Sequence, residues 1–303
     1  MNQKMEEENT GSTITELVTK TEQKGDQFFK PEGKDERVEP VIHATGSTQP
    51  PSQKTGVVHI EDRLRKSNML VRGSNLGPDF ADEYRRIKRP LLSNAFGKSA
   101  SLVEKGNLIL VTSSIAGEGK THTALNLALS IAHEQDHTVL LIDCDVTRHG
   151  TSRALGIDDR SGLVEVLEKD DVSVGDVILR TDIPELCLIS SGKQHDFVTE
   201  LLASQRMSEL VSEIGERYDD RVVIFDGPPL LPTPQAQVLA GLVGQVVFVI
   251  EAGKTPQAAV KEALAMIPEE QATGLVMNKS EGISSRSGYY YGYYSAEKKS
   301  KSK

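Results

Sequence analysis

A short apolar run that leads into a glycine-containing loop and then a helix constrains the fold of this chain most. Residues 108–112 read Leu-Ile-Leu-Val-Thr, which is typical of a buried strand. The next residues, 113–121, read Ser-Ser-Ile-Ala-Gly-Glu-Gly-Lys-Thr, and helical apolar spacing follows from Lys120. A strand, a loop ending in Gly-Lys-Thr and a helix in this order are typical of a phosphate-binding P-loop. The sequence therefore predicts a P-loop at residues 114–121, with Ser114 where the usual pattern has glycine.

Further apolar runs alternate with segments of helical periodicity along the rest of the chain. Residues 198–217 and 255–266 are examples of the helical segments. Buried parallel strands read as continuous apolar runs because helices cover both faces of their sheet. The sequence thus predicts an α/β fold, with a doubly wound, mainly parallel sheet flanked by helices. The further apolar runs lie at residues 139–142, 186–189, 222–225, 246–250 and 274–278.

Composition divides the chain into four predicted parts. The N-terminal part holds few large apolar side chains, so it cannot bury enough surface to offset its ordering entropy. Helical spacing begins at Asp79, and Pro90 predicts a kink or a break in that helix. The four parts are a disordered N-terminal region at 1–56, a linker or short helix at 57–78, a P-loop domain at 79–285 and a flexible tail at 286–303.

Charge and cysteine content narrow the functional classes. The net charge of −9 argues against a general nucleic-acid-binding protein, because no basic face dominates. Two cysteines, Cys144 and Cys187, do not form a disulfide framework, which fits a reducing cytoplasm. No run of apolar residues is long enough to span a membrane, so we expect membrane association only through a partner.

The residue types of the predicted P-loop match the chemistry of phosphate binding. Gly117 and Gly119 let backbone N–H groups converge on phosphate oxygens, and the helix that follows adds the positive end of its dipole. Lys120 supplies a cation for the β- and γ-phosphates, and the Thr121 hydroxyl can ligate Mg²⁺. The alternative, an ordinary glycine-rich turn, is disfavoured by the strand and helix on either side. The candidate ATP-binding residues of this loop are Ser114, Ala116, Gly117, Glu118, Gly119, Lys120, Thr121 and His122.

Aspartates follow two of the predicted strands. Asp143 and Asp145 come after the run at 139–142, and Asp226 precedes Gly-Pro-Pro after another run. A lone aspartate after a strand is more often a helix cap or a turn former. Two such motifs beside a P-loop instead favour a metal–nucleotide site, because the carboxyl ends of parallel strands share one ligand-binding edge. We predict that these carboxylates hold Mg²⁺, in part through water, and that one orients or deprotonates an attacking hydroxyl.

The C-terminal tail concentrates the tyrosines of the chain. Five of the seven tyrosines lie within eight residues that also contain two glycines. A phosphate-donor site and clustered phosphate acceptors in one polypeptide suggest an enzyme that phosphorylates its own tail. The candidate acceptors are Tyr289, Tyr290, Tyr291, Tyr293 and Tyr294.

Together these motifs resemble the bacterial tyrosine kinase (BY-kinase) family, in particular the autokinases of exopolysaccharide and exosortase loci. The family has a P-loop, an apolar-Asp-x-Asp motif, a strand ending in aspartate before Pro-Pro and a C-terminal tyrosine cluster. All four occur here in that order. Glu83, Arg86 and Arg89 also match the family's E-x-x-R-x-x-R oligomerisation motif. The resemblance covers residues 79–295 and implies a protein-tyrosine autokinase that uses ATP and Mg²⁺.

The resemblance also implies roles for matching residues. Arg148 fits a basic position that follows the second motif, although Thr147 stands where relatives often have another basic residue. Asn278 resembles an asparagine that contacts adenine, and Gln235 stands where many relatives have an acid. The implied catalytic residues are Lys120, Asp143, Asp145 and Asp226, and the implied Mg²⁺ ligands are Thr121, Asp143 and Asp226.

Partners and location follow from the same resemblance. It implies a homo-oligomeric ring in which each tail enters a neighbouring active site, and a role in exopolysaccharide synthesis or export. The implied partners are a membrane polysaccharide co-polymerase that acts as activator and a tyrosine phosphatase. The implied location is the cytoplasm, peripheral at the inner membrane through that partner.

Two other functions are compatible with a P-loop in this context. One is a positioning ATPase of the ParA or MinD kind, but Ile115 stands where those proteins have a signature lysine. The other is a non-catalytic, nucleotide-gated scaffold whose tail docks partners. The complete set of Lys120, Thr121, Asp143 and Asp226 argues against lost catalysis.

Overall fold

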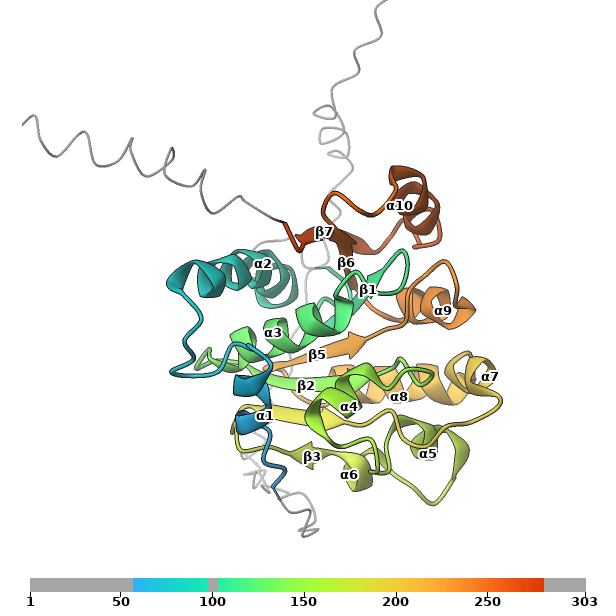
Figure 1. Cartoon of the computed structure of the whole chain (residues 1–303). Coiled ribbons are helices and arrows are strands. Elements are labelled where there is room, and N and C mark those ends of the chain that lie inside the picture. The colour runs from blue at the N-terminus through green and yellow to red at the C-terminus, as the bar shows by residue number, and fades with distance from the viewer. Residues whose placement is uncertain (1–56, 98–102, 281–303) are drawn as a thin grey trace, which may run out of the picture. The chain divides into compact units, whose positions relative to one another are not determined.

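The fold is built on one seven-stranded sheet with helices on both faces (Figure 1). The computed structural model describes residues 57–97 and 103–280. The strand order is β3-β4-β2-β5-β1-β6-β7, and every pair is parallel except β3 with β4. The strands are β1 Leu108–Ser113, β2 Thr138–Asp143, β3 Leu179–Arg180, β4 Leu186–Ile189, β5 Arg221–Asp226, β6 Gln245–Glu251 and β7 Ala272–Asn278.

Two apolar clusters hold the helices to the sheet. Ile109 and Val111 of β1 belong to one cluster, and Leu108 and Leu110 belong to the other, because successive side chains of a strand point to opposite faces. The predicted doubly wound α/β fold is confirmed. The first cluster includes residues of α1 Glu61–Lys66, α2 Pro78–Phe96, α3 Lys120–Ala132 and α4 Gly150–Leu155; the second includes residues of α5 Leu163–Glu168, α6 Val174–Val177, α7 Val198–Leu202, α8 Gln205–Glu216, α9 Pro234–Leu242 and α10 Gln257–Leu264.

All six strands expected from apolar runs are present, and the periodicity missed only β3. That strand has two residues, Leu179 and Arg180, which pair antiparallel with β4. A strand this short leaves no alternation in the sequence that could identify it.

One predicted helix is two helices. Residues 198–217 form α7 and α8, with Ala203 and Ser204 between them. The Ser204 hydroxyl accepts a hydrogen bond from the Met207 backbone N–H at 3.2 Å, which caps the start of α8. The expectation of one helix was wrong because a capping serine starts a new helix here.

Of the predicted kink or break at Pro90, the break does not occur, because α2 continues through this residue; the kink stays a prediction. Proline removes the N–H that would donate to the Arg86 carbonyl. Both Arg86 and Pro90 are exposed, so water can hydrogen-bond to that carbonyl. The inward face of α2 instead carries Tyr84 and Leu91, both buried in the first apolar cluster.

The segment before α2 is packed into the same cluster. Its apolar side chains Ile60 and Leu64 are 0% and 2% exposed. The Val58 N–H donates to the Arg180 carbonyl at 2.8 Å, and the Leu70 N–H donates to the Asn126 side chain at 2.8 Å. The predicted short helix is therefore α1, and its buried face contributes to the core.

This packing makes stability depend on the segment before α2. We expect Leu64→Ala to lower the free energy of unfolding by about 2–5 kcal/mol, because it leaves a cavity in a packed core. Lys66→Ala changes an exposed residue of the same helix and should stay within about 0.5 kcal/mol of the parent. Chemical denaturation measures both; equal stabilities for the two variants would show that α1 is not part of the folded core.

Among the described residues, no helix combines the length and the apolar character needed to cross a membrane.

Candidate active site

The predicted site residues meet at the carboxyl ends of three adjacent strands. The P-loop follows β1, Asp143 ends β2 and Asp226 ends β5, which lies between the other two strands. Asp143 and Asp226 are partners in the strand register, and both are fully buried. The sequence prediction that these groups share one edge of the sheet agrees with this geometry.

Glycine is required within the P-loop by its backbone geometry. Gly117 and Gly119 have φ angles of 93° and 99°, in the left-handed region, and α3 begins at the next residue, Lys120. A Cβ atom on Gly119 would lie 1.9 Å from the Asn278 side-chain nitrogen. The loop that follows β5 also supports the P-loop, because the Leu230 N–H donates to the Ser113 carbonyl at 2.8 Å.

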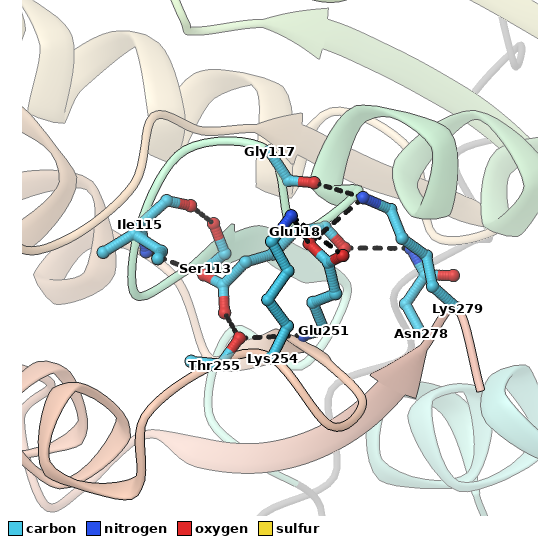
Figure 2. Close-up of polar contacts among 9 residues, drawn as sticks. All are labelled: Ser113, Ile115, Gly117, Glu118, Glu251, Lys254, Thr255, Asn278 and Lys279. Carbon is cyan, nitrogen blue, oxygen red and sulfur yellow. Dashed lines mark hydrogen bonds and ion pairs between the residues drawn. The ribbon is translucent and has the colours of Figure 1, made fainter. Parts of the chain in front are cut away.

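Side chains at the end of β7 and in the segments that follow β6 and β7 contact the P-loop (Figure 2). The Glu118 carboxylate accepts from the Ile115 N–H at 2.7 Å and from the Thr255 hydroxyl. Asn278 donates to the Glu118 carbonyl at 2.9 Å, and Lys279 donates to the Gly117 carbonyl at 2.6 Å. The Glu118 side chain and the Asn278 amide thus fix the loop conformation, so Glu118 can offer a nucleotide only its backbone.

The P-loop lysine is paired with the second aspartate of the Asp-x-Asp motif. Lys120 Nζ lies 3.1 Å from Asp145 Oδ2, and both side chains are buried. An unpaired charge in such a place would be strongly destabilising, so the pair holds Lys120 inside the site. A phosphate group in the P-loop could take the place of Asp145 as the partner of Lys120.

The two strand-end carboxylates differ in how fully they are hydrogen-bonded. Asp143 accepts on Oδ1 from the Asp145 N–H and on Oδ2 from the N–H and hydroxyl of Ser152, at 2.7–3.2 Å. Asp226 accepts on Oδ2 from the Thr151 hydroxyl at 2.7 Å. Asp226 Oδ1 is buried and has no hydrogen-bond partner among the described residues. One buried carboxylate oxygen is therefore free for a cation.

These donors fit Mg²⁺. The ion prefers oxygen ligands and is usually bound by one or two protein groups together with water and substrate phosphates. Asp226 Oδ1 and the Thr121 hydroxyl are oxygen donors of this kind, and Thr121 is close enough to Asp226 to lower its pKa. Within residues 57–97 and 103–280, no group of three or more His, Cys, Asp and Glu side chains could hold a metal ion by itself.

Burial shifts the acidity of both strand-end carboxyls. Burial, together with the nearby charge of Asp226, raises the pKa of Asp143 to about 7, although the hydrogen bonds from Ser152 oppose this shift. Burial raises the pKa of Asp226 to about 6, while the Thr151 hydrogen bond and the Lys120 charge oppose this shift. A cation between the two carboxylates would favour their charged forms.

Other predicted site residues are spread around this centre. The Ser114 hydroxyl is buried without a hydrogen-bond partner in the described chain, and Ala116 and Arg148 are exposed. The His122 ring packs edge-on against Phe80 at 6.3 Å, and burial lowers its pKa. His122 therefore lies toward the helix packing rather than the phosphate side of the loop.

The structure describes the predicted oligomerisation residues but not the predicted acceptor residues. Glu83, Arg86 and Arg89 are all exposed on α2. Tyr289, Tyr290, Tyr291, Tyr293 and Tyr294 fall outside the described residues.

Several residues that contact the site were not expected from the sequence. Thr151 and Ser152 bind the carboxylates, and Thr255 and Lys279 bind the P-loop. Hydroxyl pairs and lone lysines at loop positions are common in any chain, so no sequence signal marks them.

Sequence comparisons identify the family. Residues 106–271, over half of the chain, match the AAA domain family. The tyrosine-protein kinase YwqD of Bacillus subtilis (strain 168) is 34% identical over 213 residues, which cover 69% of this chain and 86% of the relative. The chain belongs to the bacterial tyrosine kinase family.

Further relatives share the kinase region. The tyrosine-protein kinase wzc of Salmonella typhi is 30% identical over 244 residues, which cover 80% of this kinase but 32% of the longer relative. The crystal structure of the VpsO kinase domain aligns with a TM-score of 0.53 and 28% identity, covering 67% of this kinase and 99% of that chain. Membership places the enzyme in the protein-tyrosine kinase class, and the P-loop fold implies nucleotide binding.

The raised pKa of Asp143 predicts how the stability of the kinase changes with pH. An acid with a higher pKa in the folded state binds protons more tightly when folded, so stability falls as pH rises. The stability of the parent therefore decreases between about pH 4, the pKa of this carboxyl in the unfolded chain, and about pH 7, its pKa in the folded protein. We expect the Tm of Asp143→Asn, relative to the parent, to rise by on the order of 5 °C across this window and then level off.

Thermal melts without Mg²⁺ or nucleotide measure this effect. The matched control is Asp220→Asn, at an exposed position. A Tm difference between Asp143→Asn and the parent that does not change with pH would contradict the assignment.

Proposed function

We propose that this kinase transfers the γ-phosphoryl group of ATP to the tyrosines of its own C-terminal tail. The observation that carries the proposal is the site around Lys120. A buried lysine in the P-loop faces the Asp-x-Asp motif, and the adjacent Asp226 has one free buried oxygen. A set of buried charged groups at a phosphate-binding loop suits phosphoryl transfer, in which positioning and electrostatic stabilisation do most of the work.

In this proposal each residue has a defined task. Backbone N–H groups of the P-loop and Lys120 bind the β- and γ-phosphates. Thr121 and Asp226 would hold Mg²⁺, and the bound ion would supply positive charge that neutralises charge developing on the phosphate oxygens. Asp143, fixed by Ser152, shapes the edge of this site and adds negative charge near the ion.

Asp145 is the proposed acceptor of the tyrosine proton. It is paired with Lys120 in the structure, and a phosphate partner for Lys120 would free its Oδ2 atom. The tyrosine oxygen then forms a bond to the γ-phosphorus, the bond from that phosphorus to the β–γ bridging oxygen breaks, and ADP leaves. The hydroxyl proton passes to Asp145, so that the reaction is balanced in atoms and charge.

We further propose that the tail of one copy enters the active site of a neighbouring copy within a ring. Glu83, Arg86 and Arg89 are supported as the contact because their side chains are exposed on α2. Each phosphotyrosine adds a charge of about −1.5 to −2. Several such charges on a chain of net charge −9 should loosen the ring. Phosphorylation would then drive cycles of assembly and disassembly.

The proposed setting is exopolysaccharide synthesis or export. Family membership supports a membrane co-polymerase as activator and a tyrosine phosphatase that resets the tail. It also supports a cytoplasmic location, peripheral at the inner membrane. Adenine contact by Asn278 and phosphate contact by Arg148 belong to the same proposal.

Mass spectrometry of the purified protein tests the tail assignment. After incubation with Mg²⁺–ATP, we expect phosphotyrosine within Tyr289–Tyr294 and none in a variant with all five of these tyrosines changed to phenylalanine. Tyr218→Phe, outside the tail, is the control and should leave the tail signal unchanged. Incorporation that persists in the five-fold variant at the parent level would refute the tail as the acceptor, and ATP hydrolysis without phosphotyrosine would favour a positioning ATPase.

A further inference from the structure

Two adjacent hydroxyl side chains of α4 bind the two strand-end carboxylates. The Thr151 hydroxyl donates to Asp226 Oδ2, and the Ser152 hydroxyl donates to Asp143 Oδ2, each at 2.7 Å. Thr151 and Ser152 are 1% and 0% exposed, so neither hydroxyl has bulk water as an alternative partner. Neither residue belongs to the P-loop or to the aspartate motifs.

The backbone before α4 brings these hydroxyls into the site. His149 adopts a left-handed conformation with φ 51°, and Gly150 follows it as the first residue of α4. A Cβ atom on Gly150 would lie 2.8 Å from the Thr121 hydroxyl oxygen. The start of α4 therefore passes directly beside Thr121, and Thr151, the next residue, contacts Asp226.

The two carboxylates that these hydroxyls contact differ in how many of their oxygens accept hydrogen bonds. Asp143 is hydrogen-bonded on both oxygens, by Ser152 and by the Asp145 N–H. Asp226 accepts the Thr151 hydroxyl on Oδ2, and its Oδ1 is buried without a hydrogen-bond partner among the described residues. A carboxylate anchored through one oxygen presents the other in a fixed direction, which is how proteins orient metal ligands. Thr151 thus orients the carboxylate whose Oδ1 atom has no hydrogen-bond partner among the described residues.

We propose that Thr151 is a positioning residue that sets the affinity of the kinase for Mg²⁺. It holds Asp226 Oδ2, which leaves Oδ1 as the oxygen that, with the Thr121 hydroxyl, would hold Mg²⁺. This inference rests on the Mg²⁺–nucleotide site of the proposed function. It adds a residue that touches neither nucleotide nor metal and acts only through Asp226.

A purely structural role for Thr151 makes a different prediction. If the hydroxyl only satisfies a buried carboxylate, its loss should lower stability and weaken nucleotide binding equally with and without Mg²⁺. If Thr151 positions Asp226, its loss should weaken only the Mg²⁺-dependent part of binding. The two roles are therefore separated by the Mg²⁺ dependence of nucleotide affinity.

The test uses Thr151→Val, which keeps the shape of the side chain and removes the donor. The probe is N-methylanthraniloyl-ADP, titrated into the full chain over a range of Mg²⁺ concentrations and in EDTA. We expect the Mg²⁺ concentration for half-maximal enhancement of binding to rise roughly 10- to 100-fold, with affinity in EDTA unchanged. Thr151→Ser retains a donor and should restore the parent value. Thr181→Val removes another buried hydroxyl, one bonded to the Ile183 and Leu186 carbonyls, and should match the parent.

Three results would overturn the proposal. The first is an unchanged Mg²⁺ dependence in Thr151→Val, the second is an equal loss of affinity in EDTA, and the third is no rescue by Thr151→Ser. If Thr151→Val does not fold, Thr151→Ala is measured against Thr151→Ser with the same expectations. Failure of the proposed function looks different: the parent itself would then bind the probe without any Mg²⁺ dependence, which overturns both proposals.

Discussion

Replacing Lys120 by methionine is expected to reduce tail phosphorylation at least about a hundredfold, because the variant loses the cation that contacts the transferred phosphate. Methionine has a similar length, so the P-loop backbone and its bracing by Glu118 and Asn278 should persist. Phosphotyrosine formed per minute at saturating Mg²⁺–ATP measures the effect. Because Mg²⁺–ATP is saturating, a slower rate in the variant reports a slower phosphoryl-transfer step rather than weaker nucleotide binding alone.

The control for this prediction is Lys261→Met, which changes an exposed lysine of α10 and should retain the parent rate. Thermal melting checks that the Lys120→Met protein is folded, because its Asp145 loses a buried ion-pair partner. Lys120→Arg keeps the charge and serves if the first variant unfolds. A folded variant at Lys120 with nearly the parent rate would remove this residue from the mechanism.

Asp226→Asn should produce two opposite effects. We expect the phosphorylation rate to fall roughly a hundredfold or more, because the free Oδ1 atom is then no longer part of a charged group for Mg²⁺. Above about pH 6 and without Mg²⁺, we expect the variant to be as stable as the parent or more stable. Burial raises the pKa of Asp226, so the charged form of the parent carboxylate is unfavourable in the folded state. Asparagine can still accept the Thr151 hydrogen bond.

Activity and melting temperature measured on the same preparation test this pair of effects. Asp220→Asn, at an exposed position, should leave both unchanged. An inactive Asp226→Asn protein that is also strongly destabilised at neutral pH would mean that the carboxylate supports the fold rather than the chemistry. Full activity in this variant would exclude Asp226 as a metal ligand.

The sheet could be predicted because its strands are buried on both faces. Every residue of β1 is buried, and its first four residues form an unbroken apolar run in the sequence. The chain before α2 could not be predicted in the same way, because Leu64 lies among charged residues such as Arg63 and Arg65. Only the contact of this segment with α3 and β3 shows that it belongs to the core.

The main elements of the site were predictable, and the contacts that orient them were not. Lys120, Asp143 and Asp226 follow strands, so their shared edge is a consequence of parallel pairing. The direction of the Glu118 side chain depends on Thr255, which is 137 residues away in sequence. The hydrogen bond from Thr151 to Asp226 spans 75 residues and depends on the left-handed turn at His149. Such contacts arise from tertiary packing, which local sequence patterns do not encode.

If the P-loop centre of one copy phosphorylates the tail tyrosines of another, a mixing experiment will detect the transfer. The Lys120→Met protein, with its tail intact, is incubated in Mg²⁺–ATP with active protein whose tail tyrosines are all changed to phenylalanine. We predict phosphotyrosine within Tyr289–Tyr294 of the Lys120→Met protein. If none forms there, while the parent alone phosphorylates its tail under the same conditions, transfer between copies is wrong.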